Sequence, residues 1–382
     1  MDNKEKIVVF GFGRQGRKTI KGLLLAFDIL AIVDNNSSKV GKYYNDIPIV
    51  DAISAKDLLV SNRVIVTAQP SFYKEIKKQL EEIGLVENEN FFEAHAFIPA
   101  WFLEKRKQIF LFKLDMIVTT FCSLNCEKCD AFMPYFKNKR HCTLEELKKN
   151  VDLTFKRVDY LCQFNIIGGE PFLHKDLGKL LDYIYEKYND KIGVICIITN
   201  GTIHPAPEML DRLHKYNICI SLSDYSSAVN YKDKVDALCA EFDKYEIEYM
   251  RNDNIQWYDL GFPQRIYYYS DEEVGEHMRK CNTLCQALYD GKIWYCAVSC
   301  FAYYAGLFNN IENDYIDLEE IDIEDIEKKK GILDICSGKV KNGFLEICKY
   351  CGGFGVDNDN EIPTAKQVPY NITLEPEIRK EN

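Results

Sequence analysis

The chain has 382 residues, 47% of them hydrophobic and 28% charged, which excludes a mostly disordered protein and predicts two or three domains. Acidic residues outnumber basic ones and the net charge is −11, so we expect no nucleic-acid partner and no binding to anionic membranes. No apolar run approaches the about 20 residues that cross a bilayer, and the start does not read as a signal peptide. We therefore expect a cytoplasmic protein whose 15 cysteines stay reduced or bind metal.

The first hundred residues alternate between strand and helix patterns. This alternation predicts a parallel sheet covered by helices. The charged stretch at residues 104–108 is the predicted boundary with the next domain. We expect strands at residues 7–10, 29–33 and 63–67, and helices at residues 17–27 and 72–83.

A second alternation follows and predicts a partial (β/α)6 barrel of the TIM type, with its active site on the loops after the strands. We expect strands at residues 114–119, 164–167, 194–199 and 218–222, a weaker one at 247–251, and a packed one at Tyr267, Tyr268 and Tyr269. The expected helices are residues 143–158, 177–188, 207–216 and 232–245.

From about residue 271 the periodicity is lost and glycines and cysteines recur, as in a small domain built around a metal centre. Residues 311–330 are charge-rich and predict a solvated helix face. The tail after residue 369 is expected to be mobile. The predicted fold class is α/β, with domains at residues 1–105, 106–268 and 269–382.

The strongest motif is the Cys-x3-Cys-x2-Cys spacing of Cys122, Cys126 and Cys129, directly after the first barrel strand. A [4Fe–4S] cube normally takes four thiolates. Three ligands on one loop would leave the fourth iron open to bind a small molecule. A zinc site with three cysteines is the alternative that this spacing alone leaves open.

These three cysteines resemble the cluster ligands of the radical S-adenosylmethionine (SAM) superfamily. The resemblance implies that the open iron binds SAM, that one electron cleaves its sulfonium bond, and that a 5′-deoxyadenosyl radical then takes a hydrogen atom from substrate. It also implies a flavodoxin-type or ferredoxin-type electron donor and anaerobic chemistry.

Further segments match the family in order along the chain. Gly168, Gly169 and Glu170 resemble the GGEP motif that holds the SAM amino group, and Thr199 and Asn200 resemble the segment near its ribose and methionine. Ser221, Ser223 and Asp224 follow the fourth strand and are also expected to face SAM. The family usually has an aromatic residue before the third cysteine. Here that residue is Lys128, so Phe121, Phe132 or Tyr135 is expected to pack near the adenine.

Seven more cysteines follow between residues 281 and 351. Cys281, Cys296, Cys348 and Cys351 resemble the ligand set of a twitch domain, the shortened relative of the SPASM domain, and this implies an auxiliary [4Fe–4S] cluster. Cys285, Cys300 and Cys336 are competing ligands, and a four-cysteine zinc site is the structural alternative. A fully ligated cluster near the substrate could accept an electron or relay electrons inward.

Near the start, Gly11, Gly13 and Gly16 form a G-x-G-x-x-G between a strand and a helix, and Asp34 ends the next strand. Such glycines permit a tight turn and close phosphate approach, and the acidic residue can bind a ribose hydroxyl. The segment resembles Rossmann-like half domains of sugar-modifying proteins, which implies a nucleotide or nucleotide sugar as ligand. A scaffold without ligand is the alternative.

These observations predict a radical SAM oxidoreductase or epimerase that acts on a carbohydrate-type substrate, free or nucleotide-linked. A radical SAM maturase of a ribosomally made peptide is the first alternative. A non-catalytic nucleotide-binding redox sensor is the second. The sequence names no residue that contacts the substrate.

Overall fold

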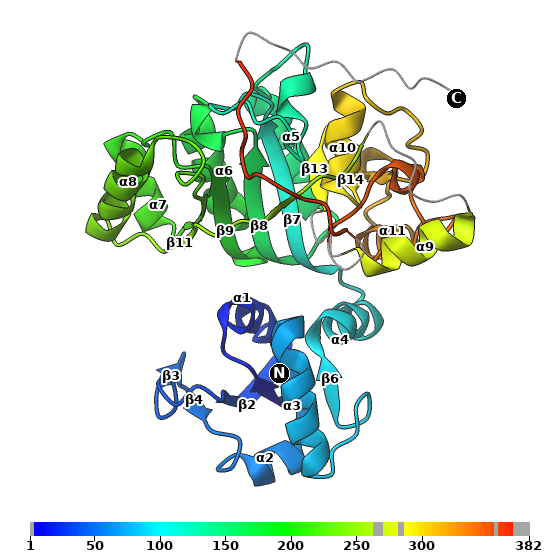
Figure 1. The fold of residues 1–382 in the computed structure, drawn as a ribbon. Coiled ribbons are helices and arrows are strands. Elements are labelled where there is room, and N and C mark those ends of the chain that lie inside the picture. Colours follow the sequence, from blue (N-terminus) through cyan, green and yellow to red (C-terminus); the bar gives the residue numbers. More distant parts are fainter. Residues whose placement is uncertain (1–3, 263–269, 282–285, 355–357, 370–382) are drawn as a thin grey trace. The chain divides into compact units, whose positions relative to one another are not determined.

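The computed structural model describes residues 4–262, 270–281, 286–354 and 358–369 of the chain. The chain divides into two compact units (Figure 1). One contains Met1–Phe112 with Val158–Cys162, and the other contains Lys113–Arg157 with Gln163–Asn382. The second unit thus holds most of the predicted barrel together with the predicted cluster region.

The first unit is built on a six-stranded sheet in the order β3-β4-β2-β1-β5-β6. Only the pair of β3 and β4 is antiparallel. The chain places β2 on one side of β1 and β5 on the other, so the loop after β1 lies at a switch point of the strand order. The strands are β1 (Glu5–Phe10), β2 (Phe27–Val33), β3 (Tyr43–Tyr44), β4 (Ile47–Val50), β5 (Arg63–Val66) and β6 (Phe91–Glu93).

Both faces of this sheet are apolar and covered. Ile7 and Val9 of β1 belong to one buried group, while Val8 and Phe10 belong to another. Burial on two faces explains why the strand has a continuous apolar run instead of an alternating one. The covering helices are α1 (Arg14–Leu23), α2 (Lys56–Ser61), α3 (Pro70–Glu82) and α4 (Ala94–Trp101), with the π-helix η1 (Phe102–Arg106) after them.

The helix expected at residues 17–27 is wrong at both ends. The observed α1 begins directly after Gly13 and ends at Leu23. Phe27 is 1% exposed and starts β2 opposite Glu5. Its apolar side chain therefore fills the core beside the sheet and does not extend the helix face.

An eight-stranded sheet runs in the order β11-β10-β9-β8-β7-β13-β14-β15, and all of it except the first three residues of β7 and of β8 belongs to the second unit. The strands β9, β10 and β11 pair in parallel, and β13 pairs in parallel with β7, whereas β14 and β15 are antiparallel. The strands are β7 (Phe110–Thr119), β8 (Tyr160–Gly168), β9 (Ile192–Thr199), β10 (Cys219–Ser223), β11 (Tyr249–Asn252), β13 (Ala287–Tyr289), β14 (Lys292–Trp294) and β15 (Tyr315–Asp317).

Helices follow the strands as the sequence predicts. The helix α5 begins with a reciprocal cap, because the Thr143 side chain accepts from the Glu146 backbone and the Glu146 side chain accepts from the Thr143 backbone. The strand expected at residues 267–269 lies outside the described residues. The helices are α5 (Leu144–Phe155), α6 (Leu177–Tyr188), α7 (Pro207–Lys215) and α8 (Lys232–Lys244), with the short 3-10 turns η2 (Met133–Tyr135), η3 (Pro171–Leu173) and η4 (Asn189–Lys191).

The last third of the chain consists of short elements. The solvated helix expected at residues 311–330 is wrong over its first half. There Ile316 pairs with Ile293 in the sheet and Leu318 is fully buried. These apolar residues therefore belong to a strand and to a 3-10 turn. The elements are β12 (Trp257–Tyr258), α9 (Asp271–Lys280), α10 (Ala297–Tyr304), η5 (Leu318–Glu320), α11 (Ile326–Cys336), η6 (Glu346–Tyr350) and β16 (Glu361–Ile362).

Among the described residues, none of the helices combines the length and the apolar character needed to span a bilayer.

Candidate functional site

The three-cysteine loop (residues 121–132) follows β7 in the second unit. Its thiols gather in one apolar group that also contains Leu124 and Ala365. Cys126 is 7% exposed, and Cys122 and Cys129 are half-buried. The three cysteines that the sequence singled out are therefore brought together in space.

Each of the three sulfur atoms accepts at least one N–H hydrogen bond. Such bonds favour the anionic thiolate, the form of cysteine that binds metal. The donors are the backbone of Leu124 (3.4 Å) and Nδ2 of Asn200 (3.6 Å) at Cys122, Nε2 of Gln367 (3.1 Å) at Cys126, and the backbone of Met133 at Cys129.

Burial opposes ionisation of the same thiols. It raises the pKa of Cys122 to about 12 and that of Cys126 to about 11, and it raises the pKa of Cys129 well above its ordinary value. A coordinated metal supplies the positive charge that deprotonates such a group outright. Three neighbouring thiols with N–H donors already in place therefore fit a thiolate-ligated metal cluster in their donor chemistry.

The segment of Gly168, Gly169 and Glu170 ends β8 and touches the three-cysteine loop by its backbone. The N–H of Glu170 donates to the carbonyl of Phe121 at 2.8 Å. A Cβ on Gly169 would lie 2.2 Å from that carbonyl oxygen and 2.8 Å from Cβ of Cys122. Glycine is required here because the two backbones meet without room for a side chain.

The side chain of Glu170 is fully buried and hydrogen-bonded to the next loop. Its carboxylate accepts from Oγ1 of Thr199, which lies 2.9 Å from both oxygens, and from the backbone of Asn200 at 2.9 Å and Phe172 at 3.1 Å. Burial raises the pKa of Glu170 to about 7. We expected this residue to hold SAM. In the structure its oxygens accept hydrogen bonds from the segment that follows β9.

Asn200 connects that segment to the cysteines. Its Nδ2 lies 3.6 Å from Sγ of Cys122 and 3.1 Å from Oγ of Ser123. The three segments expected to surround SAM therefore form one hydrogen-bonded assembly at the ends of β7, β8 and β9. Ser221 and Ser223 lie two residues apart on β10, both half-buried, and hence share a face of the strand.

The sequence analysis missed two aromatic residues at this site. Tyr225 and Trp257 pack against the group of cysteines and meet edge to face with ring centroids 5.6 Å apart. Among the residues expected beside the adenine, Phe121 is 37% exposed and its ring lies 4.7 Å from that of His141. The position of Tyr225 just after β10 was the available signal, since functional groups follow the strands in this architecture.

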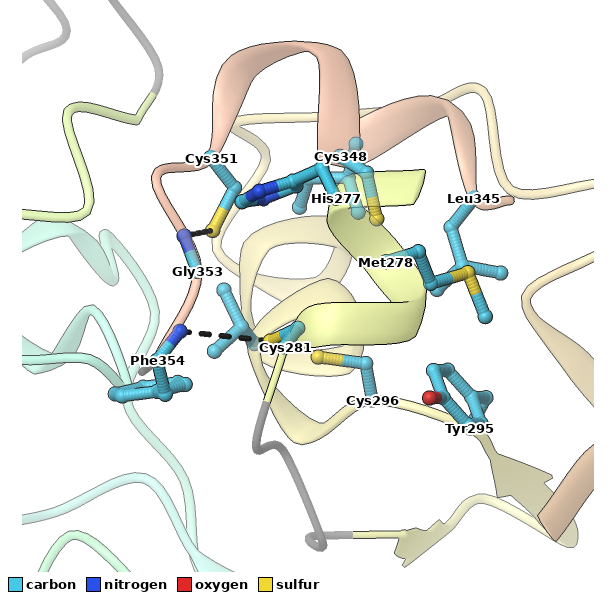
Figure 2. Close-up of a pocket in the computed structure, with 12 residues that line it drawn as sticks. His277, Met278, Cys281, Tyr295, Cys296, Leu345, Cys348, Cys351, Gly353 and Phe354 are labelled. Atoms are coloured by element: carbon cyan, nitrogen blue, oxygen red, sulfur yellow. Dashed lines mark hydrogen bonds between the residues drawn. The ribbon is translucent and has the colours of Figure 1, made fainter. Parts of the chain in front are cut away.

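A second group of cysteines lies farther along the chain. Cys281, Cys296, Cys348 and Cys351 line one cavity, and Figure 2 shows their side chains gathered around it. We refer to it as the four-cysteine cavity. Of the competing residues, Cys300 and Cys336 do not line it, and Cys285 lies outside the described residues.

Backbone groups again point at the sulfur atoms. The N–H of Gly353 donates to Cys351 and that of Phe354 donates to Cys281, each at 3.4 Å (Figure 2). Burial raises the pKa of Cys296 and of Cys351 to about 12. Within the described ranges, no group of three or more His, Cys, Asp or Glu side chains is arranged to hold a single metal ion.

Ring contacts run between the two groups of cysteines. Phe132 stands three residues after Cys129, and its ring centroid lies 5.4 Å from that of Phe262. The ring centroid of Phe262 lies 6.0 Å from that of Phe308. Phe308 in turn lies 5.9 Å from Tyr350, the residue before Cys351. A chain of packed aromatic rings therefore connects the three-cysteine loop to η6.

In the first unit, the glycine loop between β1 and α1 is tightly closed. Gly11 has a φ of +109°, and a Cβ on Gly16 would lie 2.1 Å from its carbonyl oxygen. Gly13 is the N-cap of α1. The carboxylate of Asp34, expected to bind a ribose, accepts from the backbone of Phe12 at 2.7 Å and from Nζ of Lys39 at 3.0 Å. Asp34 thus holds the loop in place.

Two family profiles match the chain. Residues 116–233 match the family described as "Radical SAM superfamily", and residues 3–91 match "C2185-like, N-terminal". The first match contains the three cysteines, the Gly–Gly–Glu segment, the Thr199–Asn200 segment and both serines of β10.

Two characterised relatives share about a quarter of the chain. One is the "S-adenosylmethionine-dependent nucleotide dehydratase" of Selenomonas ruminantium, 29% identical over 99 residues, 26% of this chain and 33% of that protein. The other is the "Antilisterial bacteriocin subtilosin biosynthesis protein AlbA" of Bacillus subtilis strain 168, 29% identical over 117 residues, 28% of this chain and 23% of that protein. The chain thus spans a third or less of the relatives it matches.

A solved structure of BtrN in complex with AdoMet and 2-DOIA covers 68% of this chain and 98% of its own, at 15% identity and a TM-score of 0.40. That likeness is too distant to inform the site. The assignment rests on the profile match, by which residues 116–233 belong to the radical SAM superfamily.

Proposed function

We propose that the chain is a radical SAM enzyme in which Cys122, Cys126 and Cys129 bind a [4Fe–4S] cluster and leave one iron open for SAM. The observation that supports this most is the gathering of the three thiols at the end of β7, each with an N–H donor. When bound, the cluster and SAM supply one-electron cleavage of the sulfonium bond and a radical that abstracts hydrogen.

The protein contributes binding, orientation and exclusion of water. Gly169 lets the loop after β8 approach the cysteines, and Glu170 braces the loop after β9 against the same site. Asn200 donates to Cys122 and so fixes the loop after β9 to the three-cysteine loop after β7. Tyr225 and Trp257 cover the cysteines with apolar surface, which restricts access of water.

We also propose that the four-cysteine cavity holds an auxiliary [4Fe–4S] cluster, with all four irons bound by thiolates. The four cysteines that line this cavity supply the four thiolates that a cube needs, and this supports the proposal. The ring contacts from Phe132 to Tyr350 support a role in electron transfer to or from the radical site. Metal analysis tests the assignment: two cubes give about eight irons per chain, and one cube plus zinc gives about four.

The proposed reaction is oxidation or epimerisation of a carbohydrate-type substrate, free or nucleotide-linked. The glycine loop of the first unit supports a nucleotide, since its backbone turns tightly at a switch point of the sheet. Similarity to a protein named as a nucleotide dehydratase supports the same class of ligand. Similarity to a bacteriocin biosynthesis protein supports the second candidate, maturation of a ribosomally made peptide.

One experiment separates these candidates. The anaerobic, iron-loaded protein is incubated with SAM, a reductant such as reduced flavodoxin or ferredoxin, and either nucleotide sugars or leader-containing peptides. The proposal expects 5′-deoxyadenosine above the uncoupled level with one of the nucleotide sugars. Stimulation by a peptide alone supports the maturase. Nucleotide binding without any SAM cleavage supports a redox sensor and contradicts both enzymes.

A further inference from the structure

The last described segment of the chain pairs with the three-cysteine loop. The C-terminal segment (residues 364–368) forms an antiparallel bridge in which Gln367 faces Cys126. The backbone of Glu127 donates to the carbonyl of Lys366 and that of Val368 donates to the carbonyl of Asn125, each at 2.8 Å. Backbone pairing therefore fixes the register of Gln367 against Cys126.

Side chains add to this pairing. Ala365 is fully buried in the same apolar group as the cysteines. Nζ of Lys366 lies 2.6 Å from a carboxylate oxygen of Glu127, and Oγ1 of Thr364 donates to the carbonyl of Ile255 at 2.8 Å. The segment is thus anchored on both sides of Gln367.

The amide of Gln367 has one orientation that satisfies its neighbours. Its Oε1 accepts from the backbone N–H of Asn125 at 2.8 Å, so the oxygen must lie on that side. Its Nε2 donates to the carbonyl of Ala365 at 2.7 Å and to Sγ of Cys126 at 3.1 Å. A flipped amide would place an oxygen against a carbonyl and a nitrogen against an N–H, so the donor is held at the sulfur.

We propose that Gln367 is a positioning residue that raises the reduction potential of the cluster bound by Cys126. An N–H bond to a ligating sulfur stabilises the more negative, reduced cluster, and such bonds are among the factors that set cluster potentials. This proposal rests on the proposed function of the three-cysteine loop. Gln367, 241 positions after Cys126 in the sequence, would then adjust how readily that cluster accepts its electron.

The test compares two substitutions that each make the local charge more negative by one. Gln367→Glu keeps the length and an acceptor for Asn125 but removes the N–H donor to Cys126. Lys366→Gln is the matched control, because it removes a positive charge on the neighbouring residue without touching the sulfur. Gln367→Met serves as an uncharged variant without a donor. Each protein is loaded with iron and taken through an anaerobic redox titration. EPR measures the midpoint potential of the cluster whose signal changes when SAM is added.

We expect Gln367→Glu to have a lower midpoint potential than its charge-matched control Lys366→Gln, and Gln367→Met to have a lower one than the wild type. The expected effect is roughly tenfold in the ratio of reduced to oxidised cluster at a fixed potential, or 59 mV for a one-electron couple. Iron content and circular dichroism are measured on the same samples. For a variant that folds and binds iron normally, a midpoint equal to that of its reference, Lys366→Gln for Gln367→Glu or the wild type for Gln367→Met, overturns the proposal.

Failure of the proposed function gives a different result. In that case the wild-type protein binds no cluster whose EPR signal responds to SAM. A responsive wild-type cluster with an unchanged potential in both Gln367 variants removes only the role assigned to Gln367.

Discussion

At the scale of single residues, the backbone of Gly169 packs so closely against the three-cysteine loop that a side chain has no room there. A Cβ there would lie 2.2 Å from the carbonyl oxygen of Phe121, beside Cys122. We predict that Gly169→Ala displaces the three-cysteine loop, destabilises the fold by about 1–3 kcal/mol and lowers iron binding. Gly13→Ala is the control, because nothing lies within 4 Å of its added Cβ. Iron content and thermal unfolding measure the effect, and wild-type values for Gly169→Ala would contradict it.

Glu170 gives a prediction about pH. Burial places its folded-state pKa at about 7, above the ordinary value of 4.5. Between these values the folded protein keeps a proton that the unfolded chain has released, so its stability falls as pH rises from 4.5 to 7 and levels off above 7. A glutamine at position 170 does not ionise in this range, so it adds no such pH dependence to the stability.

We therefore predict that the stability of the wild type relative to Glu170→Gln declines across pH 4.5–7, by at most about 3 kcal/mol. Urea unfolding of both proteins at several pH values measures this difference. A difference that does not change with pH shows that the carboxylate has an ordinary pKa.

At the scale of elements, three separate segments build the four-cysteine cavity: the end of α9, the turn after β14, and η6 with the residue after it. We predict that the double variant Cys348→Ala/Cys351→Ala loses about half of the bound iron, from about eight to about four atoms per chain. SAM cleavage without substrate should persist, because the three-cysteine loop is untouched.

Cys336→Ala provides the matched control. Its half-buried side chain lies at the end of α11 and does not line the cavity, so its removal should leave the iron content unchanged. Equal iron in the double variant and the wild type, or stoichiometric zinc in the wild type, contradicts the auxiliary cluster.

At the scale of the whole molecule, the sequence predicted the parallel strands and the loops that follow them. Buried parallel strands such as β7 and β9 have long apolar runs, and the motif residues stand directly after them, so both signals are local. The predicted ends of α1 and the first half of the helix expected at residues 311–330 were wrong. There apolar residues such as Phe27 and Ile316 pair in sheets, which a helical spacing alone cannot distinguish.

The contacts that complete the site could not be predicted in this way. Gln367 meets Cys126 across 241 positions, in a segment without periodicity, and the sequence analysis assigned nothing to it. The brace from Glu170 to Thr199 similarly depends on how two loops meet in space. Side-chain partners of this kind follow from the tertiary fold, whereas the identity of the cysteines follows from their spacing.

The central claim is that Cys122, Cys126 and Cys129 hold a cluster that cleaves SAM. The most direct measurement is the yield of 5′-deoxyadenosine after anaerobic incubation of the iron-loaded protein with SAM and dithionite. We predict that the wild type forms 5′-deoxyadenosine and methionine, and that the triple variant with alanine at these three positions forms neither while retaining iron in the four-cysteine cavity. A fully iron-loaded wild type that leaves SAM intact, or equal yields from the two proteins, would contradict the account.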